Sequence, residues 1–258
     1  MIGEKPMKKI YIINFSPTGT SLKVAEQIVE KLDYKKISID LCEEISNDIQ
    51  IEHDSICIFS MPCYGGRIPQ TAIKRLAHIQ GSKTVAVVCV TFGNRAFEDA
   101  LLELADSVES NGFQVIAGGA IATEHSIMHI YGQGRPDDLD KEEIKKFSMD
   151  INKKLKSCKL DRPSFPGNRP YKEWNGAKTP IIVDEMTCIN CGLCALKCPV
   201  KAISSDGRKV KEEVCINCMR CIKLCPQKSR SLSEIFVSTL IQHLNSACEE
   251  RKANEFYL

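Results

Sequence analysis

The stretch from Lys8 to Leu32, "KKIYIINFSPTGTSLKVAEQIVEKL", changes its hydrophobic pattern at a loop rich in hydroxyl side chains. Its first part, Lys8–Phe15, is a short run rich in isoleucine, which is typical of a buried strand in a parallel sheet. Its last part, Leu22–Leu32, has apolar residues at helical spacing. The stretch therefore predicts a strand, then a loop at the carboxyl end of that strand, then a helix.

The same alternation continues along the first part of the chain. Further strands are predicted at Lys36–Leu41, Ser55–Ser60, Thr84–Thr91 and Phe113–Thr123. Further helices are predicted at Thr71–Ile79, Ala96–Ser110 and Leu139–Cys158, with Asn111-Gly112 as a helix stop and Asp137 and Asp138 as caps. Alternating strands and helices predict an α/β domain over residues 1–160, with a five-stranded parallel sheet. Five strands fit the flavodoxin-like order 2-1-3-4-5.

The pattern breaks over residues 161–180, "DRPSFPGNRPYKEWNGAKTP", which contain four prolines and two glycines. This composition predicts an inter-domain linker. We expect Tyr171 and Trp174 to pin the linker to one of the domains, and the alternative is a place for them beside a redox centre. A second domain is predicted over 181–231, followed over 232–258 by a C-terminal helix, Leu232–Cys248, and a charged tail expected to fray.

The chain has fourteen cysteines, and eight of them lie between Cys188 and Cys225. They form an internal repeat, because "CINCGLCALKCP" begins at Cys188 and "CINCMRCIKLCP" begins at Cys215. No export signal accompanies them, so metal ligation is favoured over a disulfide framework.

Each repeat has the spacing C-x-x-C-x-x-C-x-x-x-C-P, which is typical of two-cluster iron–sulfur proteins. In such proteins the fourth cysteine of each run ligates the other cluster. The spacing thus predicts two [4Fe–4S] clusters, one held by Cys188, Cys191, Cys194 and Cys225 and the other by Cys215, Cys218, Cys221 and Cys198. Zinc is the main alternative, but four-thiolate zinc sites are often built from two separated C-x-x-C pairs.

The loop "FSPTGTS", Phe15–Ser21, follows the first strand at the edge where parallel sheets bind ligands. It lacks the lysine of a Walker A loop and is not G-x-G-x-x-G, so neither a nucleoside triphosphate nor NAD is favoured. Backbone amides at the start of the next helix can still bind a phosphate, together with the side chains of Ser16, Thr18, Thr20 and Ser21 around Gly19. The alternative is an ordinary helix-capping turn.

This loop resembles the phosphate loop of flavodoxins, in which hydroxyl residues and a glycine surround the phosphate of FMN. The segments "MPCYGGRIP" and "TFGNRAFEDAL" follow the third and fourth predicted strands, where flavodoxin-like proteins carry the loops that flank the isoalloxazine ring. The resemblance implies that FMN is also contacted by Pro62, Cys63, Tyr64, Gly65 and Gly66, and by Thr91, Phe92, Gly93, Asn94 and Arg95.

Within these loops, the glycines allow close backbone approach, and Tyr64 is the candidate for stacking on the ring. Asn94 and Arg95 would supply donors toward the ring or the partner domain, whereas Phe92 has a core position as its alternative. The sequence departs from flavodoxins in having Pro17, which has no N–H to donate, and in having no tryptophan in the ring-flanking loops.

The cysteine repeats resemble the bacterial two-cluster ferredoxins from about Ile181 to Ser231. Taken with the loops above and with "TEHS" and "GRPDD", their order resembles a family of anaerobe proteins that fuse a flavodoxin-like domain to such a ferredoxin. In the stretch that follows the fifth strand, Glu124, His125 and His129 would either manage a flavin proton or fix the loop against the second domain.

The net charge of +2 gives no reason to expect nucleic acid or a membrane surface as a partner. No apolar run approaches the roughly 18 residues of a membrane span, and Met1–Lys9 has no signal-peptide pattern, so a cytoplasmic protein is expected.

The leading hypothesis is an electron-transfer flavoprotein that relays low-potential electrons between two clusters, FMN and a redox partner protein. No catalytic residue is assigned under it. One alternative is a reductase that acts on a small organic substrate at the flavin. The other is a ferredoxin whose flavodoxin-like domain has lost FMN and serves for docking.

Overall fold

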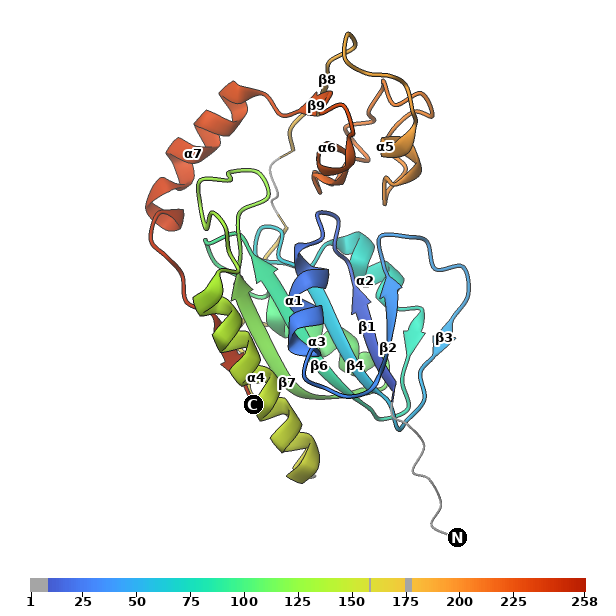
Figure 1. The fold of residues 1–258 in the computed structure, drawn as a ribbon, viewed down its shortest axis with the longest axis vertical. Coiled ribbons are helices and arrows are strands. Elements are labelled where there is room, and N and C mark those ends of the chain that lie inside the picture. The colour runs from blue at the N-terminus through green and yellow to red at the C-terminus, as the bar shows by residue number, and fades with distance from the viewer. Residues whose placement is uncertain (1–8, 158, 175–177) are drawn as a thin grey trace.

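The computed structural model describes residues 9–157, 159–174 and 178–258, so residues 1–8, Cys158 and residues 175–177 lie outside it. An α/β unit forms the larger part of the molecule (Figure 1). A small unit lies beyond the carboxyl edge of its sheet, and helix α7 runs from the small unit back along the α/β unit (Figure 1).

The main strands and helices of the α/β unit follow the predicted order, and two short strands that pair with each other are additional. They are β1 (Lys9–Asn14), α1 (Thr20–Ile28), β2 (Lys35–Asp40), β3 (Ile49–Gln50), β4 (Ile56–Pro62), α2 (Gln70–Leu76), β5 (Ile79–Gln80), β6 (Thr84–Phe92), α3 (Ala100–Ser110), β7 (Phe113–Ala122) and α4 (Asp138–Ser157). The remaining elements are β8 (Ile182–Val183), α5 (Leu193–Leu196), α6 (Arg220–Leu224), β9 (Arg230–Ser231), α7 (Glu234–Cys248) and β10 (Glu255–Tyr257). Within the described residues, no helix is both long enough and apolar enough to cross a membrane.

The main sheet has the order β10-β7-β6-β4-β1-β2, and all its strands except β10 are parallel. The flavodoxin-like α/β architecture is therefore present. The predicted count of five strands is short by one, because the last residues of the chain add β10 to the edge of the sheet.

Both faces of the sheet are buried, which explains the continuous apolar runs in the sequence. In β1, Tyr11 and Ile13 enter one core and Ile10 and Ile12 enter the other, as the two-residue period of a strand requires. Helices α2 and α3 cover the first core, and α1 and α4 cover the second. These helices cover the faces of the sheet and leave its carboxyl edge uncovered, and the small unit lies beyond that edge (Figure 1).

The C-terminal tail is ordered, so the expectation that it frays is wrong. Glu255, Phe256 and Tyr257 pair with Ala120, Gly119 and Gly118 of β7, in antiparallel register. Small residues on β7 make room for this pairing, because a Cβ atom at Gly119 would lie 3.3 Å from the Phe256 ring. The Phe256 ring packs 4.7 Å from that of Phe147 on α4.

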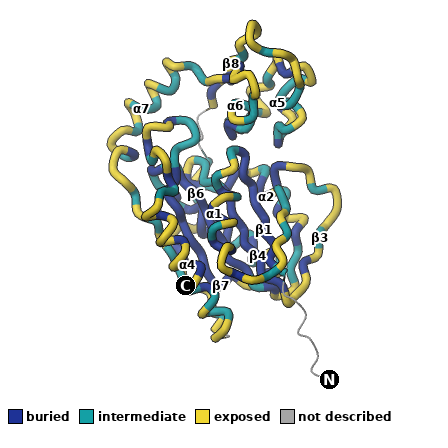
Figure 2. The backbone as a smooth tube through the Cα atoms, in the orientation of Figure 1, coloured by how far each residue is buried: buried dark blue, intermediate teal, exposed yellow. Residues whose placement is uncertain are grey.

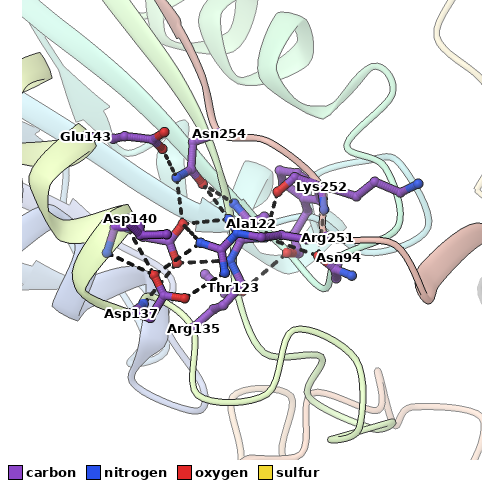
Figure 3. Close-up of polar contacts among 12 residues, drawn as sticks. Asn94, Ala122, Thr123, Arg135, Asp137, Asp140, Glu143, Arg251, Lys252 and Asn254 are labelled. Atoms are coloured by element: carbon purple, nitrogen blue, oxygen red, sulfur yellow. Dashed lines mark hydrogen bonds and ion pairs between the residues drawn. The ribbon is translucent and has the colours of Figure 1, made fainter.

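A polar network holds the segment before β10, as Figure 3 shows. Asn94 donates from Nδ2 to the carbonyl oxygens of Cys248 and Glu250, at 2.7 and 3.0 Å. Buried Arg135 pairs with buried Asp140 at 2.6 Å and donates to the carbonyl oxygen of Lys252 at 2.7 Å. The tail is thus joined to the α/β unit by both backbone pairing and buried charge.

The described part of the predicted linker has no regular structure, but its first half belongs to the surface of the α/β unit. Phe165 is buried in the core, and the backbone amides of Asn168 and Lys172 donate to Asp99. Tyr171 donates from its hydroxyl to Asp106 at 2.6 Å, so the prediction that this tyrosine pins the linker to one domain is confirmed.

The small unit has the repeat symmetry that its sequence predicts. Equivalent residues of the two repeats share the left-handed conformation, with φ of 53° and 47° at Asn190 and Asn217, and 70° and 61° at Gly192 and Met219. Most of its backbone is exposed or half-buried (Figure 2). Within its described residues, the buried apolar side chains are Ile181, Pro199, Ala202, Cys218 and Met219. The small unit therefore has little apolar core of its own. Its repeat cysteines line small cavities within it.

Candidate redox site

The eight repeat cysteines line two separate cavities, with four in each. Cys188, Cys191, Cys194 and Cys225 line the first cysteine cavity, and Cys198, Cys215, Cys218 and Cys221 line the second. The fourth cysteine of each repeat thus stands with the first three of the other repeat. This crossed grouping is the one that the spacing predicts.

The surroundings of these thiols suit a sulfur-rich group. The backbone N–H groups of Ala202 and Ser229 each donate to a cysteine Sγ at 3.3 Å, and these two residues are equivalent in the repeats. A third N–H, from Asn217, donates to Cys215 Sγ at 3.4 Å. A Cβ atom at Gly207 would lie 3.0 Å from Cys194 Sγ, so this glycine leaves room beside the first cavity. Backbone donors aimed at sulfur are among the features that tune iron–sulfur clusters.

A third cavity, of about 420 Å³, lies at the carboxyl edge of the sheet and is called the loop cavity below. The three loops predicted from the sequence meet around it. They contribute Thr18, Thr20 and Ser21, then Pro62, Cys63, Tyr64 and Gly65, then Thr91, Gly93 and Arg95.

The first of these loops leaves donors available at the start of α1. Gly19 has φ of 90°, which favours glycine, and its N–H closes the turn onto Ser16 O at 3.1 Å. Ser16 is buried and accepts from Leu22 N, so it shapes the loop without lining the cavity. Thr18 and Thr20 line the cavity, and their hydroxyl groups make no hydrogen bond within the described part of the chain.

Besides Ser16 and Gly19, three predicted residues do not line the loop cavity. Phe92 is buried and packs 5.5 Å from Phe97, which is the core position named as its alternative. Asn94 uses its side chain on the C-terminal segment, as described above. Gly66 faces Glu98 and Lys172, because a Cβ atom there would collide with the Glu98 carboxylate.

In the second loop, Cys63 and Tyr64 keep their protons at ordinary pH, because burial raises the pKa of each. Burial raises the pKa of Cys63 to about 12, so its thiol keeps its proton and donates weakly to the carbonyl oxygens of Ala96 and Phe97. Burial also raises the pKa of Tyr64 well above its ordinary value. Tyr64 therefore offers the loop cavity an aromatic ring with a protonated hydroxyl.

The titratable residues of the loop after β7 have different roles. Glu124 accepts from His129 at 2.7 Å and from Gly134 N at 2.9 Å, which fixes the loop. His125 lines the loop cavity, and burial lowers its pKa to about 4. Its Nδ1 atom accepts from the backbone N–H of Ile127 and Met128, which leaves Nε2 as the protonated nitrogen. A neutral histidine donor thus faces the cavity at ordinary pH.

Sequence reasoning missed several walls of the loop cavity. Trp174 of the linker lines it, with its indole Nε1 4.0 Å from the Cβ position of Gly65. Whether this tryptophan lies beside a redox centre, the alternative named above, stays a prediction that depends on what the loop cavity binds. Helix α7 contributes Phe236, Leu240 and Leu244, and the second repeat contributes Ile216 and Asn217. In the sequence, the single tryptophan was a signal that the linker could reach this cavity. Helix α7 and the loop of the second repeat carried no such signal.

A fourth cavity, of about 930 Å³, adjoins the loop cavity and is called the outer cavity. The two share Thr18, Thr20 and the start of the loop after β7. The outer cavity also has charged side chains of both signs, among them Lys23, Glu26, Lys223 and Glu234. There is thus space beside the phosphate loop in addition to the loop cavity.

Comparison with known proteins finds a family match within the small unit. Residues 187–229 match the family of 4Fe-4S dicluster domains. No curated protein matches the sequence. The similar solved structures include a flavodoxin from the domain Archaea, with 14% identity and a TM-score of 0.37 over 57% of this chain and 99% of that chain.

Two others are bacterial. The flavodoxin of Fusobacterium nucleatum bound to flavin mononucleotide has 20% identity and a TM-score of 0.39, and the match covers 57% of this chain and 99% of that one. The Flv1 flavodiiron core of Synechocystis has 15% identity and a TM-score of 0.40, with 59% and 37% covered. The chain thus combines an α/β unit whose sheet has the flavodoxin-like strand order with a segment, residues 187–229, that matches the family of 4Fe-4S dicluster domains.

Proposed function

We propose that this protein is an electron-transfer flavoprotein that carries FMN in the loop cavity and one [4Fe–4S] cluster in each cysteine cavity. The clusters supply one-electron chemistry at low potential, and FMN supplies both one- and two-electron chemistry. A redox partner protein, still to be identified, exchanges electrons with the clusters. No catalytic residue is required of the chain, whose role is to bind, space and insulate these groups.

The donor sets fit the groups assigned to them. Four thiols in each cysteine cavity match the four ligands of a cubane cluster. Thr18 and Thr20, at the N-terminus of α1, offer hydroxyl and amide donors to a phosphate monoester. Tyr64 and Trp174 provide aromatic surface in the same cavity, which suits a flat ring system.

The observation that carries the proposal is that two residues line both the loop cavity and the second cysteine cavity. Ile216 and Asn217 line both the loop cavity and the second cysteine cavity. The side chain of Asn217 is fixed by hydrogen bonds with the backbone of Thr179, at 2.7 and 3.2 Å. A cluster held by Cys198, Cys215, Cys218 and Cys221 would therefore be separated from the flavin by a thin and rigid layer of protein.

Charge complementarity holds this arrangement in place. Lys197 and Lys201 of the small unit pair with Glu43 and Glu44 of the α/β unit, at 2.8 and 2.7 Å. Arg75 donates to the carbonyl oxygen of Pro199 at 2.5 Å. Pro199 lines the second cysteine cavity, so these contacts join the part of the small unit beside that cavity to the α/β unit.

An anaerobic cofactor count tests the proposal. Iron, acid-labile sulfide and released FMN per chain should come to about eight, eight and one. About four iron atoms would mean that one cysteine cavity is empty, and zinc in place of iron would sink the redox assignment. Full iron and sulfide without flavin would establish a ferredoxin with a docking domain instead.

The outer cavity favours a second candidate, a reductase whose small organic substrate enters beside the flavin. Its volume of about 930 Å³ leaves ample room for a second molecule. Steady-state turnover that saturates with a quinone, a nitro compound or a free flavin would support this function. Activity that requires a protein partner, with no saturation by any of these molecules, would reject it.

A further inference from the structure

The two cysteine cavities differ at one equivalent position of the repeats. Counting five residues beyond the fourth cysteine gives Ile203 after Cys198 and Arg230 after Cys225. Ile203 lines the second cysteine cavity, and Arg230 lines the first. A cation thus occupies, in one half of the unit, the place that an apolar side chain occupies in the other.

Arg230 is an unusual arginine because it is buried and unpaired. Only 4% of it is exposed. Its Nη2 atom donates to the carbonyl oxygen of Gly207, whereas its buried Nη1 atom has no partner. No carboxylate pairs with it within the described part of the chain. A buried, unpaired guanidinium is costly, so its position requires a compensating negative charge.

We propose that Arg230 is the counter-charge of the cluster in the first cysteine cavity and raises its reduction potential. This inference rests on the proposed function, since it requires the clusters to be present. Four thiolates outweigh the positive charge of a [4Fe–4S] core, so each assembled centre is anionic and becomes more so on reduction. A fixed cation beside the cluster stabilises the reduced form more than the oxidised form, because net charge is among the factors that set the potential.

The test is a potentiometric titration of the iron-loaded protein, followed by electron paramagnetic resonance. Arg230→Gln removes the charge and keeps a polar side chain of moderate length. It should lower the one-electron reduction constant of the cluster in the first cysteine cavity by about tenfold, which is about 59 mV. Arg230→Lys keeps the charge and should give a smaller fall than Arg230→Gln.

Arg208→Gln is the matched control, because Arg208 belongs to the same unit but is exposed. It changes the net charge equally, and water screens the lost charge, so both potentials should stay near the wild-type values. Equal shifts in Arg208→Gln and Arg230→Gln would overturn the inference, as would unchanged potentials in an Arg230→Gln protein with full iron.

If Arg230→Gln loses iron, the iron content of Arg230→Lys decides between two explanations. If Arg230→Lys regains the iron, the charge is the required feature and the inference stands. If Arg230→Lys also lacks iron, the shape of arginine matters rather than its charge, and the inference fails. The iron content of the wild-type protein is measured first, and its absence would reject the proposed function instead.

Discussion

Thr18 and Thr20 are the side chains of the phosphate loop that retain hydrogen-bonding capacity for a ligand. Their neighbours are already engaged, since Ser16 accepts from Leu22 N and Ser21 shares a hydrogen bond with Thr91 at 2.7 Å. Pro17 is buried and has no N–H, so it contributes shape alone. Binding of a phosphate at this loop therefore depends on two hydroxyl groups and on the amides at the start of α1.

The double change Thr18→Ala, Thr20→Ala should weaken FMN binding and leave the iron content unchanged. Each lost hydrogen bond to a charged group costs about 1.5 kcal/mol, so the dissociation constant should rise about a hundredfold. Fluorescence titration of flavin into the flavin-depleted protein measures the effect. The double change Thr71→Ala, Thr239→Ala is the control, since neither residue lines the loop cavity. Iron loss together with flavin loss would mean that the two domains are not independent.

At this scale, sequence patterns identified residues whose place follows from the backbone. Loops at the carboxyl ends of parallel strands must share one edge, and ten of the predicted flavin contacts do line one cavity there. Asn94 and Trp174 could not be placed in this way. Asn94 bonds a segment more than 150 residues away in the chain, and Trp174 enters the cavity from an irregular linker, so both depend on tertiary contacts alone.

Among the elements, β10 shows what a hydrophobic pattern cannot reveal. It has three residues, too few to show a two-residue period, and its pairing depends on the small residues Gly118 and Gly119 of β7. Its position is secured from outside the strand by the ion pair between Arg135 and Asp140. Long strands such as β6 were predicted well, because burial on both faces of the sheet gives them a continuous run of apolar residues.

Asp140→Asn should detach this tail at neutral pH. Burial opposes ionisation of Asp140, but hydrogen bonds from Arg135, from Asp137 N and from Asn254 hold its pKa below the ordinary value. The substitution leaves the buried Arg135 without its counter-ion, so the free energy of unfolding should fall by about 3 kcal/mol. Urea unfolding at about pH 7 measures the loss.

The pH dependence gives a second check on the same carboxylate. Because the pKa of Asp140 is lower in the folded chain, its contribution is present above the unfolded pKa of about 3.9 and is lost as the pH falls toward the folded value. The difference between wild type and Asp140→Asn should therefore shrink below about pH 4. Asp138→Asn is the control, because that side chain is 98% exposed, and its effect should stay within about 0.5 kcal/mol. A difference that is the same at both pH values would contradict the ion-pair explanation.

In the whole molecule, two kinds of contact join the small unit to the α/β unit. Helix α7 and the tail form a continuous strap on one side, where Tyr131 donates to Asn245 at 2.8 Å. Exposed ion pairs on the other side bring Lys197 and Lys201 to Glu43 and Glu44. The strap limits how far the units can separate, and the ion pairs decide how closely the second cysteine cavity meets the loop cavity.

Reversing one side of this interface, with Glu43→Lys and Glu44→Lys, should loosen the docked arrangement without removing a cofactor. Two exposed pairs contribute about 1 kcal/mol together, and reversal replaces them with repulsion of similar size. A change of about 2 kcal/mol lowers the docking equilibrium about thirtyfold. The rate of flavin reduction by the clusters, followed after rapid mixing with a reductant, should fall accordingly, and it should rise again with the charge swap Lys197→Glu, Lys201→Glu.

The control for this reversal is Asp138→Lys with Glu142→Lys, which makes the same change of charge on the exposed face of α4. Since α4 lies away from the small unit (Figure 1), this control should leave the rate unchanged. High salt should weaken the effect of the reversal, because the pairs are exposed and water with salt screens them. A reversed protein that transfers electrons at the wild-type rate would show that the strap alone sets the distance between the second cysteine cavity and the flavin. In that case shortening or lengthening the segment between β9 and α7 would become the way to change the rate.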